Sequence, residues 1–290
     1  MSSARGRGDE CVYPGGGAEN GSVFQMAVEV VHFNPMRRRP GLLGRVLPRR
    51  PLNNFGDLLG PALVARIVQE RALVEPDAPR RLLAVGSIMK MSRPGDTVWG
   101  AGVNGKSMDA GGAPDLDVRA VRGPRTRDLL RDLGMTVGDV FGDPALLWPR
   151  FFSRDWYLER HPAPRREVAV VPNFHDRHRF SGAEVVDPLG DPHEVITQIA
   201  HADFVCGSSL HGVVLAEAFG IPARLIRPGA EPAFKYDDYY GGTGRASHAP
   251  ADDIAGAKRL GGEPPAVIDA DGLLAAFPAD LWAPRSATRE

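Results

Sequence analysis

Residues 201–222, with the sequence HADFVCGSSLHGVVLAEAFGIP, contain the side chains best suited to chemistry. The pattern predicts a short buried strand, a turn of small residues, and a helix over residues 211–219. A helix that opens directly after such a turn aims its free backbone N–H groups at one spot, where an anion can bind. Ser208 and Ser209 form the turn, and His211 lies in the first helical turn. We therefore predict a proton-transferring imidazole beside an anion site. The alternative is a capping serine followed by an incidental histidine.

Further polar residues follow other predicted strands. The strand at residues 97–100 leads into a glycine-rich segment with Gly102, Asn104 and Lys106, where the main chain can approach a ligand closely. This segment has neither the Walker spacing nor the dinucleotide fingerprint, so it does not support nucleotide binding. Arg122 precedes a predicted helix, and its planar guanidinium suits a carboxylate or a phosphate. Most arginines around it are expected to be ordinary surface residues.

Three other residues have more than one interpretation. Asp57 lies before a helix predicted over residues 58–70, where it is either the N-cap or an acceptor for a substrate hydroxyl. Lys235 belongs to residues 233–242, AFKYDDYYGG, which we predict to be a loop that faces a sugar or packs on the surface. His175 lies in a turn after the strand predicted at residues 166–172.

Composition describes an ordinary soluble enzyme. The chain has 290 residues, 43% apolar and 24% charged, with a net charge of −1 that favours neither nucleic acid nor an anionic membrane as partner. Cys11 and Cys206 lie far apart, which indicates a reducing compartment and argues against a disulfide framework or a zinc site. No apolar run approaches the roughly 18–20 residues of a membrane span, so we expect a cytoplasmic protein without an integral membrane segment. Residues 1–22 are rich in Gly and Ser and are expected to be disordered.

Strands and helices alternate along the chain, which predicts an α/β fold. Besides the elements above, we expect strands at residues 24–33, 81–85, 116–121, 139–141 and 224–227, and helices at 126–133, 191–202, 268–277 and 280–282. We place a domain junction at residues 150–166, which lack clean periodicity. The prediction is two Rossmann-like, doubly wound domains, at residues 23–155 and 165–262, followed by closing helices at 263–290. Ligands of such folds bind where the carboxyl ends of the strands meet, here in the cleft between the domains.

An ordered set of short motifs adds a resemblance. The motifs are 54–57 (NFGD), 99–102 (WGAG), 121–124 (VRGP), 142–145 (GDPA), 208–212 (SSLHG), 217–222 (EAFGIP) and 235–239 (KYDDY). Together they resemble the polysaccharide pyruvyl transferase family over roughly residues 50–240. The resemblance implies a glycosyltransferase-B-like architecture and transfer of a pyruvyl group from phosphoenolpyruvate onto two sugar hydroxyls. It also implies an exopolysaccharide or cell-wall glycan acceptor, and phosphate as the second product.

The resemblance gives the candidate residues roles. Arg122 and the turn with Ser208 and Ser209 would hold the carboxylate and phosphate of phosphoenolpyruvate, and His211 would transfer a proton. No metal or other cofactor is implied. An acceptor linked to a lipid would place the protein loosely at the inner face of the membrane.

Two positions depart from the family pattern. Family members often have Arg where this chain has Ser209, so another cation is expected to replace it, with Arg119, Arg125, Lys106 and Lys235 as candidates. Many members also place a His directly after the strand-ending Pro172, whereas here the nearest is His175.

Two other classes of function stay open at this point. A glycosyltransferase that uses a nucleotide sugar would share the fold, and it would need a site for a base and a diphosphate. A glycan- or anion-binding module without activity would follow if the Ser209 departure removed catalysis.

Overall fold

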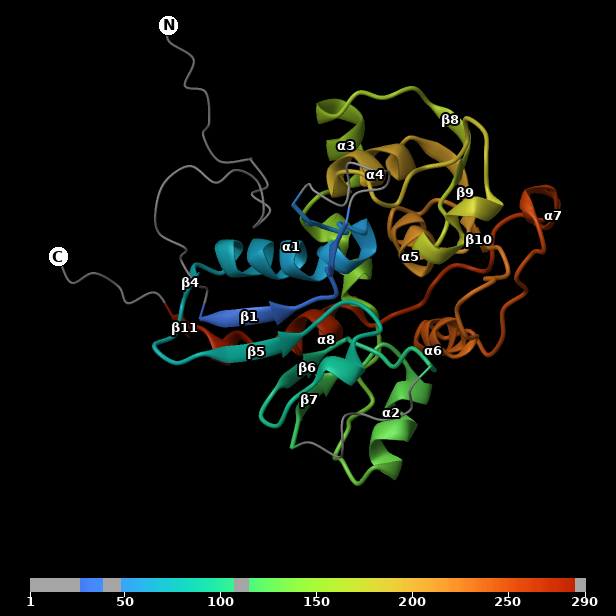
Figure 1. The fold of residues 1–290 in the computed structure, drawn as a ribbon. Helices are drawn as coiled ribbons and strands as arrows, with labels where there is room; N and C mark the ends of the chain where they lie inside the picture. Colours follow the sequence, from blue (N-terminus) through green and yellow to red (C-terminus); the bar gives the residue numbers. More distant parts are fainter. Residues whose placement is uncertain (1–26, 39–47, 107–114, 285–290) are drawn as a thin grey trace, which may run out of the picture.

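The computed structural model describes residues 27–38, 48–106 and 115–284. Its first sheet consists of β1 (Val28–Val31), β5 (Arg80–Leu83), β6 (Thr97–Trp99) and β7 (Asp117–Ala120). All pairs are parallel, and the spatial order β1-β5-β6-β7 follows the chain (Figure 1). The carboxyl ends of these strands therefore open on one edge of the sheet.

The second sheet is also parallel and contains a reversal of strand order. It consists of β8 (Arg166–Val170), β9 (Ala202–Gly207) and β10 (Ala223–Leu225), in the order β10-β9-β8. Single parallel bridges add Val185 beside β8 and Ala251 beside β10. Residue 185 and β9 lie on opposite sides of β8. The chain therefore adds residue 185 on one side of β8 and then crosses back to add β9 on the other side. Such a switch point leaves a crevice at the carboxyl ends of the two diverging strands, β8 and β9.

Helices and short strands complete the chain. The α-helices are α1 (Phe55–Glu70), α2 (Pro124–Asp132), α3 (Arg154–Arg160), α4 (Pro192–Ala200), α5 (Leu210–Ala218), α6 (Phe234–Gly242), α7 (Ile254–Leu260) and α8 (Ala270–Ala275). The 3₁₀ helices are η2 (Met89–Met91), η3 (Pro144–Arg150), η4 (Phe174–Arg179) and η5 (Ala279–Leu281). Two antiparallel pairs join β2 (Met36–Arg37) to β3 (Arg50–Pro51) and β4 (Leu73–Val74) to β11 (Ala283–Pro284).

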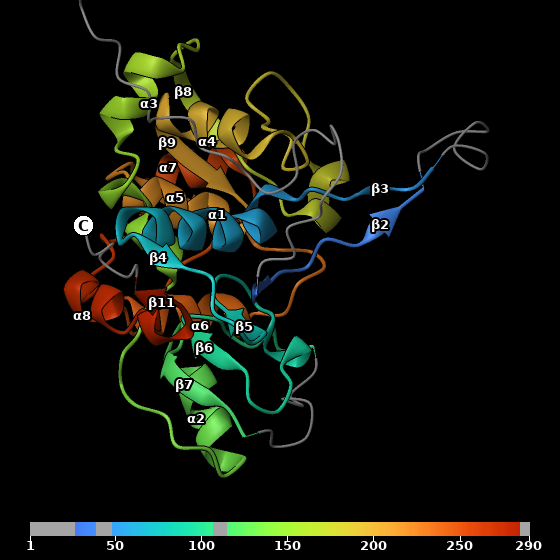
Figure 2. The same ribbon diagram turned by 90° about the vertical axis from the view of Figure 1, so that its left-hand side faces the viewer.

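The end of the described chain returns to the first sheet. Through its pairing with β4, β11 lies beside the early part of the chain, and α8 lies next to the first sheet (Figures 1 and 2). The indole N–H of Trp99 on β6 donates a 2.8 Å hydrogen bond to the carbonyl of Leu273 on α8. The closing segment therefore stabilises the first half of the molecule.

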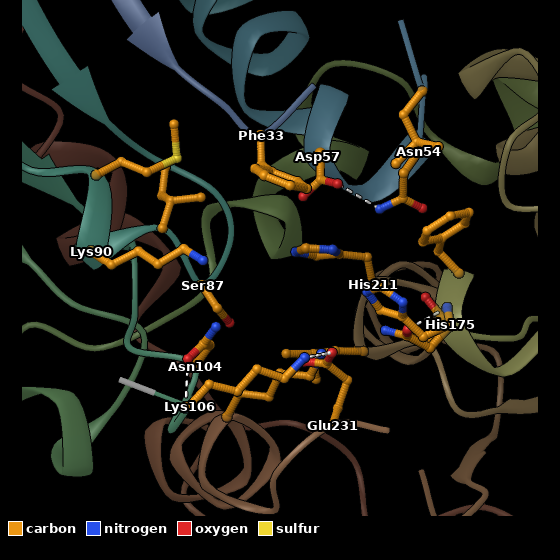
Figure 3. Close-up of a pocket in the computed structure, with 18 residues that line it drawn as sticks. Phe33, Asn54, Asp57, Ser87, Lys90, Asn104, Lys106, His175, His211 and Glu231 are labelled. Atoms are coloured by element: carbon orange, nitrogen blue, oxygen red, sulfur yellow. Dashed lines mark hydrogen bonds and ion pairs between the residues drawn. The ribbon is translucent and has the colours of Figure 1, made fainter. Parts of the chain in front are cut away.

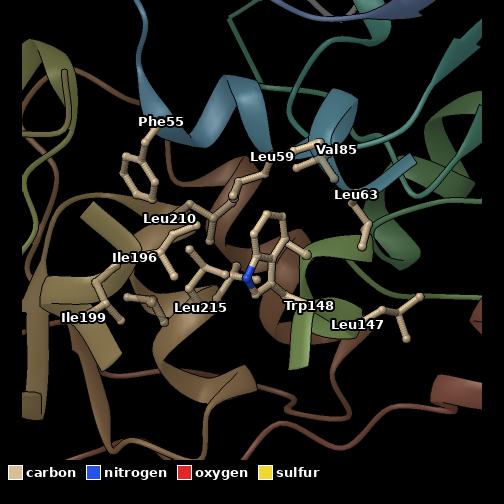
Figure 4. Close-up of a cluster of buried hydrophobic side chains, with 14 of the residues drawn as sticks. Phe55, Leu59, Leu63, Val85, Leu147, Trp148, Ile196, Ile199, Leu210 and Leu215 are labelled. Atoms are coloured by element: carbon tan, nitrogen blue, oxygen red, sulfur yellow. The ribbon is translucent and has the colours of Figure 1, made fainter. Parts of the chain in front are cut away.

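One large hydrophobic core extends across both halves. Figure 4 shows Leu59 and Leu63 of α1, Trp148 of η3 and Leu215 of α5 converging on the same cluster. α1 packs against α4 and η3, so it lies between the two sheets. The structure thus confirms an α/β fold with parallel sheets that is consistent with a Rossmann-like architecture. The two-domain division and the glycosyltransferase-B-like arrangement stay predictions.

One local prediction was wrong. Residues 233–242 are not a loop, because Phe234–Gly242 form the helix α6, and its aromatic residues Tyr236, Tyr239 and Tyr240 are buried. Their spacing of three and four positions places them on one helical face, so they fill the core and are not available to face a sugar. Residues 150–166, where we place the domain junction, contain α3, and its Tyr157 is fully buried. The position of the junction stays a prediction.

Candidate functional site

A polar cavity of about 200 Å³ lies between the carboxyl ends of the two sheets. The segments after β1, β5 and β6 contribute lining residues from one side, and the segments after β8, β9 and β10 contribute them from the other. Figure 3 shows Asp57, His211, Lys106 and Glu231 around this space. The cavity therefore includes the β8/β9 switch point, where α/β folds bind ligands.

The turn after β9 positions His211. Gly207 has φ of 145°, and a Cβ there would lie 2.0 Å from the carbonyl oxygen of Val171, so this close passage requires glycine. The Ser209 N–H then donates to the Val171 carbonyl, and the Ser209 hydroxyl caps α5 by accepting from the Gly212 N–H. His211 follows in the first turn of α5 and lines the cavity.

The two ring nitrogens of His211 face different neighbours. Nε2 is buried without a hydrogen-bond partner and lies 3.6 Å from Oδ2 of Asp143, a carboxylate with no solvent exposure. Nδ1 lies against the start of α1, where a Cβ on Gly56 would come within 2.3 Å of it. Glycine at position 56 thus makes room for the imidazole.

Asp57 is the acidic group at the same end of the cavity. It lies in the first turn of α1, and the Asn54 side chain donates a 2.8 Å hydrogen bond to its Oδ2. Burial raises the pKa of the Asp57 carboxyl above its ordinary value, although the Asn54 hydrogen bond and the nearby His211 and Lys235 oppose that shift. A carboxyl with a raised pKa keeps its proton to a higher pH, which suits a general acid. The N-cap of α1 is Asn54, so the N-cap interpretation of Asp57 was wrong.

Two lysines and one glutamate form the other end. Lys235 of α6 donates a 3.1 Å hydrogen bond to Glu231, and Lys106 forms an ion pair with the same carboxylate. Burial lowers the pKa of the Lys235 ammonium, and Glu231 partly offsets this. For Glu231, the lysines outweigh burial and hold the carboxyl pKa below its usual value. Two cations share one carboxylate, so this end carries an excess of positive charge for an anionic ligand.

The structure places Arg122 behind the cavity wall and not on its surface. The side chain is fully buried and ion-paired with Asp238 at 3.0 Å. Its Nη1 donates a 2.6 Å hydrogen bond to the hydroxyl of Ser87, and its Nη2 donates to the carbonyl of Val103. The prediction that Arg122 contacts an anionic substrate is therefore at odds with the structure, because its side chain is fully buried and does not line the cavity. Through Ser87, which lines the cavity, Arg122 supports the wall.

Two other predicted binding residues also have structural roles. Gly102 packs against the guanidinium of Arg122, where a Cβ would lie 2.4 Å from Cζ, so it provides space for that side chain. Ser208 is fully buried, and its hydroxyl accepts a hydrogen bond from the Asn173 N–H. Neither residue lines the cavity, in contrast to the prediction.

The remaining predicted residues do meet at the cavity. Asn104, Lys106, His175, Ser209, His211, Lys235 and Asp57 all line it. His175 is exposed on η4 at the rim. Of the four cations considered as replacements, Arg119 pairs with Asp117 and Asp280, and Arg125 pairs with Asp237, whereas Lys106 and Lys235 line the cavity. A further lysine, Lys90, also lines it.

Comparison with known proteins finds a family model that matches the middle part of the chain. Residues 97–229, from β6 to just beyond β10, match the polysaccharide pyruvyl transferase family. The match covers somewhat less than half of the chain, and it is a likeness to that family. It includes Lys106, Asp143 and His211, whereas Asp57 and Lys235 lie outside it. The expected family resemblance is thus confirmed.

Two curated proteins are similar in sequence to this chain. The succinoglycan biosynthesis protein ExoV of Rhizobium meliloti (strain 1021) is 27% identical over 195 residues, which is 64% of this chain and 60% of ExoV. The uncharacterized protein L143 of Acanthamoeba polyphaga mimivirus is 26% identical over 156 residues, 49% of this chain and 52% of that protein. The chain therefore spans less than two thirds of the length of either relative.

A solved structure is similar at a lower level. It belongs to a functionally uncharacterized protein from Klebsiella pneumoniae and shares 13% sequence identity, with a TM-score of 0.45. The match covers 64% of this chain and 83% of that chain.

Sequence reasoning missed Asp143, which lies beside His211, and Glu231, which lines the cavity. The GDPA motif already contained Asp143, and an acidic residue directly after a predicted strand at a sheet edge was the available signal. Glu231 has no comparable signal, because its pairing with two lysines arises only in the fold. Among the described residues, no group of three or more His, Cys, Asp or Glu side chains is arranged to hold a metal ion. No helix in the described ranges is long and apolar enough to cross a membrane.

Proposed function

We propose that the protein transfers the pyruvyl group of phosphoenolpyruvate onto two hydroxyls of a glycan, forming a cyclic ketal. Both hydroxyl oxygens form bonds to C2 of the donor, and the bond from C2 to the phosphate oxygen breaks. Of the two hydroxyl protons, one goes to the C3 methylene, which becomes a methyl group, and the other leaves with the phosphate. The reaction therefore needs anion binding and proton transfer in one site.

The observation that carries this proposal is the division of the cavity into two ends. Lys106 and Lys235 provide positive charge for the phosphate and carboxylate of the donor. At the other end, Asp57 can donate a proton because burial raises its pKa, and His211 can accept one from an attacking hydroxyl. Two titratable groups held in different environments are the arrangement that acid–base catalysis requires.

The size of the cavity also supports a compact donor. About 200 Å³ lies below the roughly 300–1,000 Å³ of typical pockets for drug-sized ligands. Phosphoenolpyruvate fits such a space more readily than a nucleotide sugar does. The similarity to a protein named for succinoglycan biosynthesis favours an exopolysaccharide acceptor. Following the family resemblance, we further propose that this acceptor is linked to a lipid and presented at the inner face of the membrane.

The test is release of inorganic phosphate from phosphoenolpyruvate in the presence of lipid-linked oligosaccharides. We expect release that depends on the acceptor, a mass increase of the glycan that matches a pyruvate ketal, and a loss of about 100-fold or more in kcat for His211→Ala. The His178→Ala variant serves as the matched histidine control and should retain most of the activity, because His178 is exposed on η4 and does not line the cavity.

Two results would contradict the proposal. In the first, the folded protein releases no phosphate from phosphoenolpyruvate with any acceptor. The other is turnover of a UDP-sugar in the same assay, which would assign the cavity to glycosyl transfer.

A further inference from the structure

Two buried polar atoms without hydrogen-bond partners face each other at the inner wall of the cavity. They are Oδ2 of Asp143 and Nε2 of His211, at a separation of 3.6 Å. Asp143 has no solvent exposure, and 13% of the His211 side chain is exposed. Native proteins rarely leave buried polar atoms unpaired, so a facing pair of this kind calls for an explanation.

The Asp143 carboxylate has one fixed oxygen and one free oxygen. Its Oδ1 accepts a 3.0 Å hydrogen bond from the Ala145 N–H and caps η3. For Oδ2, His211 is the one basic side chain of the described residues found within ion-pair distance. A buried carboxylate is costly unless it is hydrogen-bonded or paired. The fold therefore directs this oxygen at the imidazole.

We propose that Asp143 is a positioning residue for His211 and fixes the tautomer in which Nε2 carries the proton. Nδ1 is then the nitrogen that exchanges a proton with the ligand. The catalytic part of this inference rests on the proposed function, whereas the tautomer does not. A separation of 3.6 Å is longer than a hydrogen bond, and such contacts often tighten only when substrate binds.

The opposite side of the ring supports the assignment of Nδ1. This nitrogen faces the first turn of α1, where Gly56 leaves space for it and Asp57 follows directly. The charge of His211 acts on Asp57, so the two groups are close enough to interact. When Asp143 holds the protonated Nε2, the unprotonated Nδ1 of His211 faces the side of the cavity where Asp57 lies.

The direct test is ¹⁵N NMR of the imidazole nitrogens in the neutral form, with no substrate present. The chain has 8 histidines, so the His211 signals are assigned by their loss in His211→Gln. We expect the wild type to show the Nε2–H tautomer and Asp143→Asn to shift toward Nδ1–H, because the asparagine amide can donate to Nε2. The asparagine can still cap η3, so the fold should persist.

Asp96→Asn is the matched control. Asp96 is a buried aspartate that accepts a hydrogen bond from the Arg93 N–H and does not line the cavity. This variant should leave the His211 tautomer unchanged. An Nδ1–H tautomer in the wild type, or the same tautomer in wild type and Asp143→Asn, would overturn the inference.

Kinetics then separate this inference from the proposed function. With phosphoenolpyruvate and the glycan acceptor, Asp143→Asn should lower kcat by about 100- to 10,000-fold and leave KM within about threefold. A rise in KM with unchanged kcat would contradict a positioning role. If the tautomer depends on Asp143 and no ketal forms, the proposed function fails while the positioning of His211 stands.

Discussion

At the scale of single residues, the site depends on glycines whose missing side chains leave space for larger neighbours. Gly56 has no side chain at the one place where the His211 imidazole approaches α1, and Gly102 leaves the same kind of space for Arg122. Sequence reasoning assigned Gly102 to a ligand, because a glycine-rich segment after a strand favours close approach of a ligand. The structure shows that the group approaching Gly102 is an internal guanidinium.

Gly56→Ala tests the link between α1 and His211. The new Cβ would lie 2.3 Å from Nδ1, so the imidazole must move, and we expect kcat to fall by about 10- to 100-fold. Stability should change little or rise, because alanine favours a helix over glycine by about 1 kcal/mol. Phosphate release and thermal unfolding measure the two effects separately.

Gly138→Ala is the control, since a Cβ there meets no atom within 4 Å. Full activity in Gly56→Ala would show that the position of the His211 ring does not matter. Loss of activity together with a large drop in the unfolding temperature would point instead to damage of the helix.

At the scale of elements, a buried polar network joins α2 to α6. Asp238 on α6 accepts from Arg122, from the Thr126 N–H and from the Thr126 hydroxyl. The two helices approach so closely that a Cβ on Gly123 would lie 1.8 Å from the Asp238 carbonyl oxygen. This network fixes α6 and thereby Lys235.

We expect Asp238→Ala to destabilise the protein by about 3–5 kcal/mol, because it leaves the buried guanidinium of Arg122 without its partner. The neighbouring Asp237→Ala removes a pair with Arg125, whose side chain is 52% exposed, and should cost less than about 1 kcal/mol. Chemical denaturation of both variants measures the difference. Equal losses would mean that the Arg122–Asp238 pair does not stabilise the native state.

At the scale of the whole molecule, the cavity joins both sheets, so a ligand should stabilise the fold as a unit. Phosphoenolpyruvate at 100 times its Kd should add about 2.7 kcal/mol and raise the unfolding temperature by several degrees. Lys106→Gln should lose most of this gain, because it removes one of the two cations at the anion end. Lys235 remains in that variant to pair with Glu231, so the fold itself should tolerate the change.

Lys258→Gln is the matched control for this thermal-shift measurement. Lys258 is a partly exposed lysine paired with Glu184, and it lies outside the cavity. Its variant should respond to phosphoenolpyruvate as the wild type does. An equal response in Lys106→Gln would place the anion elsewhere, and a shift caused equally by inorganic sulfate would indicate a general anion effect.

The sequence by itself determined the alternation of strands and helices, the order of the motifs, and a set of polar residues at strand ends. These are local signals, set by hydrophobic periodicity and by turn residues, and they were enough to bring His211, Lys106 and Asp57 into consideration. Only the tertiary structure decided which of the polar groups are free. Arg122 looked like a ligand-binding residue until Asp238, 116 positions away, neutralised it. Asp143 gained its significance only when the fold placed it against His211. Burial and charge pairing depend on which distant residues meet, and local sequence does not contain that information.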